Sequence, residues 1–212
     1  EFPGRYSSAI DVPDAVDEYR RILSTRPDNS VVLLSIGYLT NFRDLINSKP
    51  DQYSDLGGRE LIEQKVSFWV CMGGEFPSGR EANIRWDTDA SIEAIRKWPT
   101  DIIFSGWEIG LMDTGENITD LPRSSPVRRS YELFNRIPHK NWDQVALLFT
   151  VRGMENGPSS HYWEISEPGR LIIVPSDGSN TWEYDQKGSH RYLIQLGSDE
   201  EIAKEIDSLM MH

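Results

Sequence analysis

Three short apolar stretches decide the fold, and they read Val31-Val32-Leu33-Leu34-Ser35-Ile36, Lys65-Val66-Ser67-Phe68-Trp69-Val70-Cys71 and Asp101-Ile102-Ile103-Phe104-Ser105. Their apolar residues follow one another without the polar alternation of a half-exposed strand, which is typical of strands buried on both faces of a parallel sheet. Helical patterns lie between the stretches. This alternation predicts an α/β domain with right-handed crossovers and a mostly parallel sheet flanked by helices.

The helices are predicted from apolar residues spaced three or four apart. One such pattern covers residues 14–26, and another covers residues 88–98. Thr40 is expected to cap a helix that runs through Ile46, while the polar stretch over residues 48–59 is expected to form a surface loop.

The chain changes character near Ser159. Residues 126–153 carry helical patterns, whereas the later residues form short alternating runs that predict β-hairpins. Ser198 and Glu201 have the spacing of a capping box for a last helix. We therefore divide the chain into an α/β domain, residues 1–158, and a hairpin-rich extension with a terminal helix, residues 159–212, packed on the same domain.

Composition excludes several classes of protein. The 22 Lys and Arg residues against 34 Asp and Glu residues give a net charge of −12, which argues against nucleic-acid binding. The longest apolar runs are about half of the roughly 18 residues that a membrane helix needs, so no membrane span is expected. The lone Cys71 excludes an internal disulfide and leaves the compartment open. The start Glu1-Phe2-Pro3-Gly4, without Met, suggests that something upstream has been removed or is not shown.

Sheets of this kind bind ligands beyond the carboxyl ends of their strands, so the loops that follow the apolar stretches are the candidate sites. After Ile36 the strand stops at Gly37 and a helix begins a few residues later. A backbone carbonyl left unpaired at such a strand end can ligate a hard cation. The alternative is an ordinary strand-to-helix turn.

The second loop runs from Met72-Gly73-Gly74 to Glu81-Ala82-Asn83. Two glycines directly after a buried strand let the backbone approach a ligand closely. Glu81 and Asn83 point the same way if the segment is extended, and a carboxylate beside an amide suits the hydroxyls of a sugar. The alternative is a solvated, charged turn.

The third segment, Asn141-Trp142-Asp143-Gln144, leads into an apolar helix. An acid in the first turn of a helix can serve as a cap that complements the helix dipole, and Trp142 can be a core aromatic. The functional alternative is that both side chains face a ligand.

In order and spacing, these segments resemble the nucleoside hydrolase family, the calcium-dependent inosine-uridine-type N-ribohydrolases. The stretch from Ser35 to Asn41 is similar to the family's Thr-Gly-Pro-Leu-Thr-Asn. The second loop, with Asp87 and Asp89-Ala90 beyond it, is similar to the Met-Gly-Gly, Glu-Phe-Asn and Asp-Pro-Glu-Ala series. Trp142-Asp143 is similar to the late His-Asp or Trp-Asp pair. The match covers residues 16–152 and implies a Rossmann-like nucleoside hydrolase fold.

The resemblance implies a site and a reaction. The carbonyl of Ile36 and the carboxylate of Asp143 would ligate Ca²⁺, Glu81 and Asn83 would hold ribose hydroxyls, and Met72 would pack against the sugar. The family cleaves the N-glycosidic bond of a ribonucleoside through a transition state that resembles an oxocarbenium ion. Asp143, Trp142 and Asn83 are the implied catalytic residues. Tryptophan cannot transfer a proton to the leaving base, but in the purine-specific branch an indole stacks on it, so purine nucleosides such as inosine are favoured.

One element of the family is missing from this sequence. An Asp-rich segment after the family's first strand supplies the general base and two calcium ligands, and nothing here matches it. We therefore expect the chain to be the carboxyl-terminal part of such a fold, with the amino-terminal half as a separate chain or missing segment. Homo-oligomers are left open.

Two other classes of protein are weighed against the enzyme. The first is a catalytically silent nucleoside- or sugar-binding module that keeps Glu81 and Asn83. The second is a structural subunit that uses the aromatic tail for protein contacts.

Overall fold

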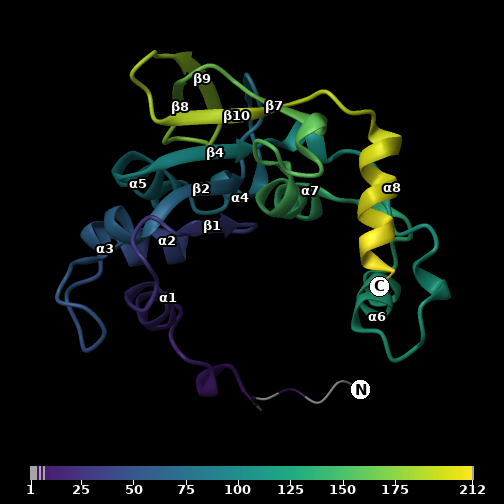
Figure 1. Cartoon of the computed structure of the whole chain (residues 1–212), viewed down its shortest axis with the longest axis horizontal. Helices are drawn as coiled ribbons and strands as arrows, with labels where there is room; N and C mark the ends of the chain where they lie inside the picture. The colour runs from purple at the N-terminus through teal and green to yellow at the C-terminus, as the bar shows by residue number, and fades with distance from the viewer. Residues whose placement is uncertain (1–3, 5, 7, 212) are drawn as a thin grey trace.

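The computed structural model describes residues 4, 6 and 8–211, so the opening Glu1-Phe2-Pro3 lies outside the described residues. Its centre is formed by three parallel strands, β1 (Val31–Ser35), β2 (Val66–Met72) and β4 (Asp101–Ser105), paired in that order (Figure 1). They coincide with the three apolar stretches of the sequence. The expectation of a mostly parallel central sheet flanked by helices is confirmed.

The residues after Ser159 enlarge this sheet. Strand β10 (His190–Gln195) pairs in parallel with β4, and β7 (Trp163–Ile165) pairs with β10 in the antiparallel direction. Beyond β10 the order continues through β8 (Gly169–Ile173), β9 (Asn180–Tyr184) and β3 (Ser78–Gly79). The expected hairpin strands are present, and one of them lies inside the central sheet. The division at residue 158 stays a prediction.

Helices cover both faces of the sheet. On one face Trp69 and Cys71 of β2 pack into a core with α1 (Ala15–Ser24), α2 (Thr40–Ile46), α3 (Gly58–Lys65) and α5 (Thr88–Lys97). On the other face Val70 packs with α7 (Trp142–Leu148) and α8 (Asp199–Met210). Burial raises the pKa of the Cys71 thiol to about 12, so this cysteine is a small core residue.

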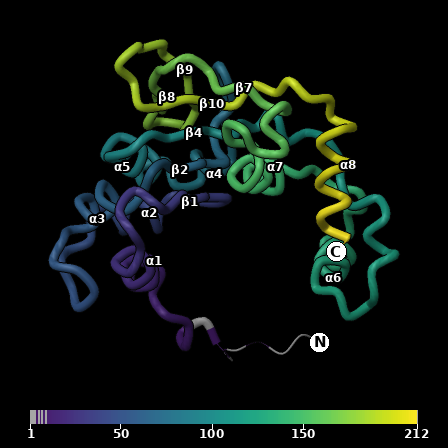
Figure 2. Tube along the Cα trace, viewed as in Figure 1, coloured from purple at the N-terminus to yellow at the C-terminus, as the bar shows by residue number. Residues whose placement is uncertain are grey.

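The remaining helices are short or peripheral. A four-residue helix, α4 (Ala82–Arg85), follows the second loop, and α6 (Pro126–Phe134) lies against the carboxyl-terminal end of α8, where the Tyr131 hydroxyl contacts Met210 Sδ (Figure 2). In the described part of the chain, no helix is both long and apolar enough to cross a membrane.

Local signals at the helix ends were predicted unevenly. The capping box of Ser198 and Glu201 is confirmed at the start of α8. Thr40 is not a cap, because Leu39 takes that position and the Thr40 hydroxyl instead hydrogen-bonds a carboxylate oxygen of Asp87. The expected loop over residues 48–59 ends early, since α3 begins at Gly58.

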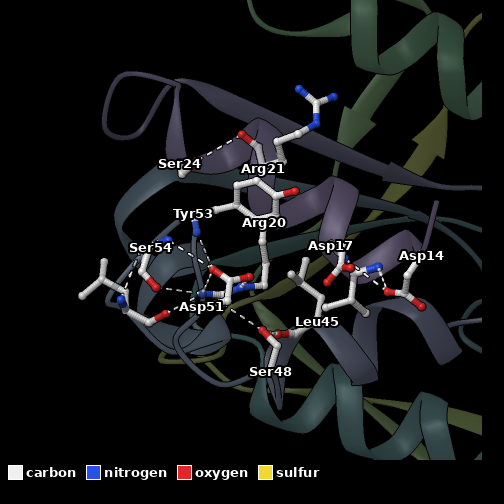
Figure 3. Close-up of polar contacts among 12 residues, drawn as sticks. Asp14, Asp17, Arg20, Arg21, Ser24, Leu45, Ser48, Asp51, Tyr53 and Ser54 are labelled. Carbon is white, nitrogen blue, oxygen red and sulfur yellow. Dashed lines mark hydrogen bonds and ion pairs between the residues drawn. The ribbon is translucent and has the colours of Figure 1, made fainter.

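A buried arginine fixes the loop that precedes α3. The Arg20 guanidinium, on α1, donates to both carboxylate oxygens of Asp51, at 2.6 and 3.0 Å (Figure 3). It also donates to Ser48 Oγ at 3.0 Å and to the carbonyls of Ser54 and Leu56 at 3.1 and 2.9 Å. All three guanidinium nitrogens thus donate hydrogen bonds, which offsets the cost of burying the charge.

Candidate functional site

The strands β1, β2 and β4 end at one edge of the sheet, at Ser35, Met72 and Ser105, which we call the carboxyl edge. The loops that follow β2 and β4 are hydrogen-bonded to each other there. Gly73 N donates to the carbonyl of Ser105 at 3.1 Å, and Trp107 N donates to the carbonyl of Gly74 at 2.9 Å. The second candidate loop is therefore held by the loop after β4.

Glu81 is a buried carboxylate that organises the second loop. Its Oε1 accepts from Asn83 N at 2.7 Å, and its Oε2 accepts from Ile84 N at 3.2 Å and Gly74 N at 3.3 Å. Burial raises the pKa of this carboxyl, while the three amide donors oppose that rise. The sequence pattern predicts Glu81 and Asn83 on the same side of an extended segment. That segment is not extended, because Glu81 caps α4 and Asn83 lies in the first turn of this helix.

Asn83 and Met72 nevertheless meet. The Asn83 side-chain amide donates to the Met72 carbonyl at 3.2 Å and contacts Met72 Sδ at 3.1 Å. Met72 is buried at the end of β2, whereas Asn83 is half-buried. Three of the residues proposed for the sugar, Met72, Glu81 and Asn83, thus lie together at the carboxyl edge.

The hairpin region also holds this loop, which the sequence did not indicate. Asn180, buried at the start of β9, accepts from Glu75 N at 3.1 Å and donates to the Glu75 carbonyl at 2.8 Å. Because β3 pairs with β9, the segment between Met72 and Glu81 is fixed on both sides. One role of the region after Ser159 is therefore to position the second loop.

Glu108 is a candidate residue that sequence reasoning missed. It follows β4 in the loop that was recognised as informative, and its Oε2 accepts from Phe76 N at 3.1 Å. Burial, and to a smaller extent the nearby charge of Glu75, raise the pKa of the Glu108 carboxyl. The signal was available, since Gly106-Trp107-Glu108 places a glycine, an aromatic and an acid directly after a buried strand.

Trp142 is anchored at the start of α7 by a second tryptophan. The rings of Trp107 and Trp142 stack with centroids 4.2 Å apart and planes 20° apart, and the Trp142 indole N–H donates to the Trp107 carbonyl at 2.9 Å. Both side chains are half-buried. Of two further tryptophans, Trp163 is buried and Trp86 is exposed.

Asn141 and Asp143, the residues on either side of Trp142, lack hydrogen-bond partners for their side chains among the described residues. Asp143 is exposed, and in the described part of the chain its carboxylate has no hydrogen bond or ion pair, so it does not cap α7. Desolvation by neighbouring groups raises the pKa of its carboxyl. Asn141 takes the cap position, is fully buried, and has neither its side-chain oxygen nor its nitrogen paired among the described residues.

Ile36 lies at the open end of β1. It is half-exposed and lines an open cavity of about 470 Å³ together with Gly37, Tyr38 and Asn41. The bond between Thr40 and Asp87 ties this first loop to the residues beyond α4. All three candidate loops thus lie at the carboxyl edge, although the structure provides no contact between Ile36 and Asp143.

A calcium ion needs more oxygen donors than the two candidate ligands supply. Ca²⁺ takes about six to eight oxygen ligands. Across residues 4, 6 and 8–211, no group of three or more His, Cys, Asp or Glu side chains is arranged to hold a metal. The Asp143 carboxylate and the Ile36 carbonyl are two oxygens, so these residues alone do not fit the ion.

The fold and its carboxyl edge define a mixed α/β protein with a polar and aromatic site at its strand ends. No family model and no curated protein matches the sequence. Among the solved structures that match, the crystal structure of an inosine-uridine preferring nucleoside hydrolase from Bacillus anthracis is similar, with a TM-score of 0.59 and 16% sequence identity. The match covers 94% of this chain and 66% of that chain, so this chain spans just under two thirds of its neighbour's length. The nucleoside hydrolase-like fold expected from the sequence is thereby supported at the level of the fold.

Proposed function

We propose that this chain forms part of an enzyme that hydrolyses the N-glycosidic bond of ribonucleosides, with purine nucleosides such as inosine favoured, to give ribose and free base. The observation that carries the proposal is the joint position of Met72, Glu81 and Asn83 beside the stacked Trp107 and Trp142, at the edge where α/β sheets bind ligands. The similarity of the fold to a nucleoside hydrolase supports the reaction class.

Asn83, Glu81 and the pair of Trp107 and Trp142 have different proposed roles. Asn83 already donates to Met72, so its amide oxygen is the group offered to a ribose hydroxyl. Glu81 holds the loop through its three amide bonds and contributes a negative charge near the sugar, where positive charge develops in the transition state. The Trp107 and Trp142 pair offers an aromatic surface to the base, on which a purine would stack more extensively than a pyrimidine.

The remaining part of the proposal concerns Ca²⁺ and a partner. Asp143 and the Ile36 carbonyl are proposed as two of its ligands, and the others would come from a separate segment that docks at the free edge of β1. Among the described residues β1 pairs only with β2, and the half-exposed Ile36 continues that open edge. An unpaired edge strand is a template for a further strand. The third of the neighbour's chain that has no counterpart here is consistent with such a segment.

The proposal is tested by measuring both nucleoside binding and the release of free base. Titration calorimetry with inosine and with ribose, and chromatography of released base, are run on the complete assembly of this chain with the docking segment, with calcium and with a chelator. We expect inosine to bind and base to be released only with calcium. The variant Asp143→Asn should lose turnover and calcium dependence while keeping its circular dichroism spectrum and melting temperature. Full activity in that variant would refute the assignment of Asp143.

A silent nucleoside- or sugar-binding module is the second candidate, favoured because the described residues contain no group of three or more His, Cys, Asp or Glu side chains that could hold a metal ion. It predicts that inosine binds through Asn83 with no base released under any condition. Asn83→Ala would then abolish binding, whereas Asp143→Asn would leave it unchanged. A structural subunit predicts neither binding nor turnover.

A further inference from the structure

The proposed reaction leaves one chemical requirement without a residue. When the bond between the ribose and the base breaks, the base keeps the electron pair, and protonation of one of its ring nitrogens makes it a better leaving group. Trp142 cannot supply that proton, because its indole N–H is a hydrogen-bond donor only and is bonded to the Trp107 carbonyl at 2.9 Å. Glu81 is held by three backbone amides, and Asp143 is one of the two proposed calcium ligands.

A histidine lies beside the tryptophan pair. The imidazole of His139 packs against the ring of Trp142 with ring centroids 6.2 Å apart and with the two planes 84° apart, which is close to perpendicular. The ring of Phe134 is its other aromatic neighbour, with centroids 5.0 Å apart. Trp107, Trp142 and His139 thus follow one another in a series of ring contacts.

The backbone around His139 is tied to the loop that follows β4. His139 belongs to the two-residue strand β6 (His139–Lys140), which pairs with β5 (Asp113–Thr114) in the antiparallel direction. Two residues further on, the N–H of Asn141 donates to the carbonyl of Gly110 at 3.1 Å. Because Gly110 and β5 both follow the first tryptophan of the pair in the chain, the segments that carry the two tryptophans also fix the histidine.

The imidazole is available for proton transfer. His139 is half-buried, and in the part of the chain that the structure describes neither of its ring nitrogens has a hydrogen-bond or ion-pair partner. Histidine is the side chain that serves most often as a general acid near neutral pH. The adjacent cation, Lys140, is already paired with the carboxylate of Asp113 at 3.0 Å, so it is not the free donor of this region.

We propose that His139 is the general acid that protonates the leaving base, an inference that rests on the proposed function. A purine stacked on the tryptophan pair lies beside the imidazole, within reach of it directly or through one water. As the bond between C1′ of the ribose and the glycosidic nitrogen breaks, its electron pair stays with the base, and the imidazolium proton moves to another ring nitrogen of the base. Water forms the new bond to C1′ and releases one proton to solvent, from which the imidazole is protonated again.

Two substrates with different leaving groups test this role. The complete assembly of this chain with the docking segment is assayed with inosine and with 4-nitrophenyl β-ribofuranoside, whose leaving phenolate needs no proton. His139→Gln should slow inosine hydrolysis at least about a hundredfold and leave the nitrophenyl rate unchanged, because an amide cannot transfer the proton. The matched control is His161→Gln, an exposed histidine whose ring packs on Tyr162 with centroids 4.1 Å apart, which should change neither rate.

The outcomes separate proton transfer from other roles. Equal losses on both substrates in His139→Gln would overturn the proposal, because they would mean that His139 only positions the tryptophan pair, and an unchanged inosine rate would overturn it as well. If the natural assembly released neither base nor nitrophenolate, the proposed function itself would fail. Release of nitrophenolate alone would instead remove only the acid. Circular dichroism and the melting temperature report whether each variant folds, and His139→Asn is the second variant if His139→Gln does not.

Discussion

Two buried asparagines at the carboxyl edge show how differently the two halves of the candidate site are built. Asn180 has its side-chain oxygen and nitrogen both bonded to the backbone of Glu75, and so fixes the loop after β2. Asn141, at the start of α7, has neither atom paired among the described residues. Beside it the Asp143 carboxylate is also without a partner there, whereas Glu81 accepts three amides.

In the loop after β2 the polar groups of Asn180 and Glu81 are paired within this chain, whereas at the start of α7 those of Asn141 and Asp143 have no partner in the part of the chain that the structure describes. An unpaired buried amide costs free energy, so a folded protein retains one where another group completes it. At the start of α7 the side chain of Asn141 is unpaired among the described residues, and Asp143, one of the two proposed calcium ligands, lies two residues further on. The loop that carries the proposed sugar-binding residues is thus held by bonds within the chain, and the α7 side is where we propose that a further segment contributes.

The largest expected effect is the loss of stability when the buried and hydrogen-bonded Arg20 is replaced. Arg20→Met removes all the bonds of the guanidinium and leaves Asp51 and two carbonyls without their donor. Because a charge stripped of its buried partner is costly, we expect a loss of about 3 to 5 kcal/mol in the free energy of unfolding, measured by urea denaturation.

Arg21→Met is the matched control. Arg21 forms its ion pair with Glu18 at the same 2.6 Å, but both side chains are largely exposed. A loss below about 0.5 kcal/mol is expected, because exposed pairs contribute little. Equal losses in the two variants would mean that burial around Arg20 is not what stabilises the loop.

Glu81→Ala should produce the next largest effect. The variant leaves three backbone N–H groups around the second loop without their acceptor. We expect a loss of about 2 to 3 kcal/mol by urea denaturation, together with loss of inosine binding. Glu75→Ala, which removes an acceptor from a single exposed amide, should cost less than about 1 kcal/mol. If the two variants were equally stable, Glu81 would not be the organiser of the loop.

The carboxyls of Asp51 and Glu81 should also respond to acid with opposite sign, because the pKa of the first is lowered and that of the second is raised. The hydrogen bond from Arg20, with those from the amides of Tyr53 and Ser54, lowers the pKa of Asp51 to about 2 from its ordinary value of 3.8. The folded protein therefore binds fewer protons than the unfolded chain between these values, so the stability that Asp51 contributes is present above pH 3.8 and is lost as the pH falls toward 2. Glu81, whose pKa is raised, loses its stabilising protonation as the pH rises above 4.5.

Urea denaturation at several pH values separates the two contributions. The difference in stability between the natural protein and Asp51→Asn should shrink as the pH is lowered through the window of Asp51. A difference that stays constant down to pH 2 would show that Asp51 keeps an ordinary pKa in the folded state. The exposed pair of Arg21 and Glu18 again supplies the comparison, through Glu18→Gln.

Much of the fold could be predicted because it depends on local patterns. The apolar runs that begin near Val31, Val66 and Asp101 form strands whose ends lie within a residue or two of the predicted ends. A short, continuous apolar run is typical of a strand buried in a sheet. The start of α8 at Ser198 could also be predicted, because the capping box involves residues only three apart in the sequence. Thr40 was misplaced because its hydroxyl found a better acceptor in Asp87, far along the chain.

The site was predictable only where its residues follow strand ends. Met72, Glu81 and Asn83 belong to one loop, so their proximity follows from the sequence, whereas the orientation of Glu81 depends on a helical turn that the sequence did not indicate. Asn180 comes from a hairpin about a hundred residues away, and the stack of Trp107 on Trp142 joins two segments 35 residues apart. Such contacts join segments that are distant in the sequence, so no local pattern specifies them.

The smallest expected effect is the sharpest test of the comparison between the two asparagines. Asn141→Leu replaces an unpaired buried amide with an apolar group of similar shape, so it removes a desolvation cost and no hydrogen bond. We expect the stability of the chain to change by less than about 1 kcal/mol, or to rise. Asn180→Leu, at an equally buried position, should cost about 2 kcal/mol because it leaves Glu75 N–H and C=O unpaired. If Asn141→Leu instead cost as much as Asn180→Leu, Asn141 would be paired in solution, and the start of α7 would be as complete as the loop after β2.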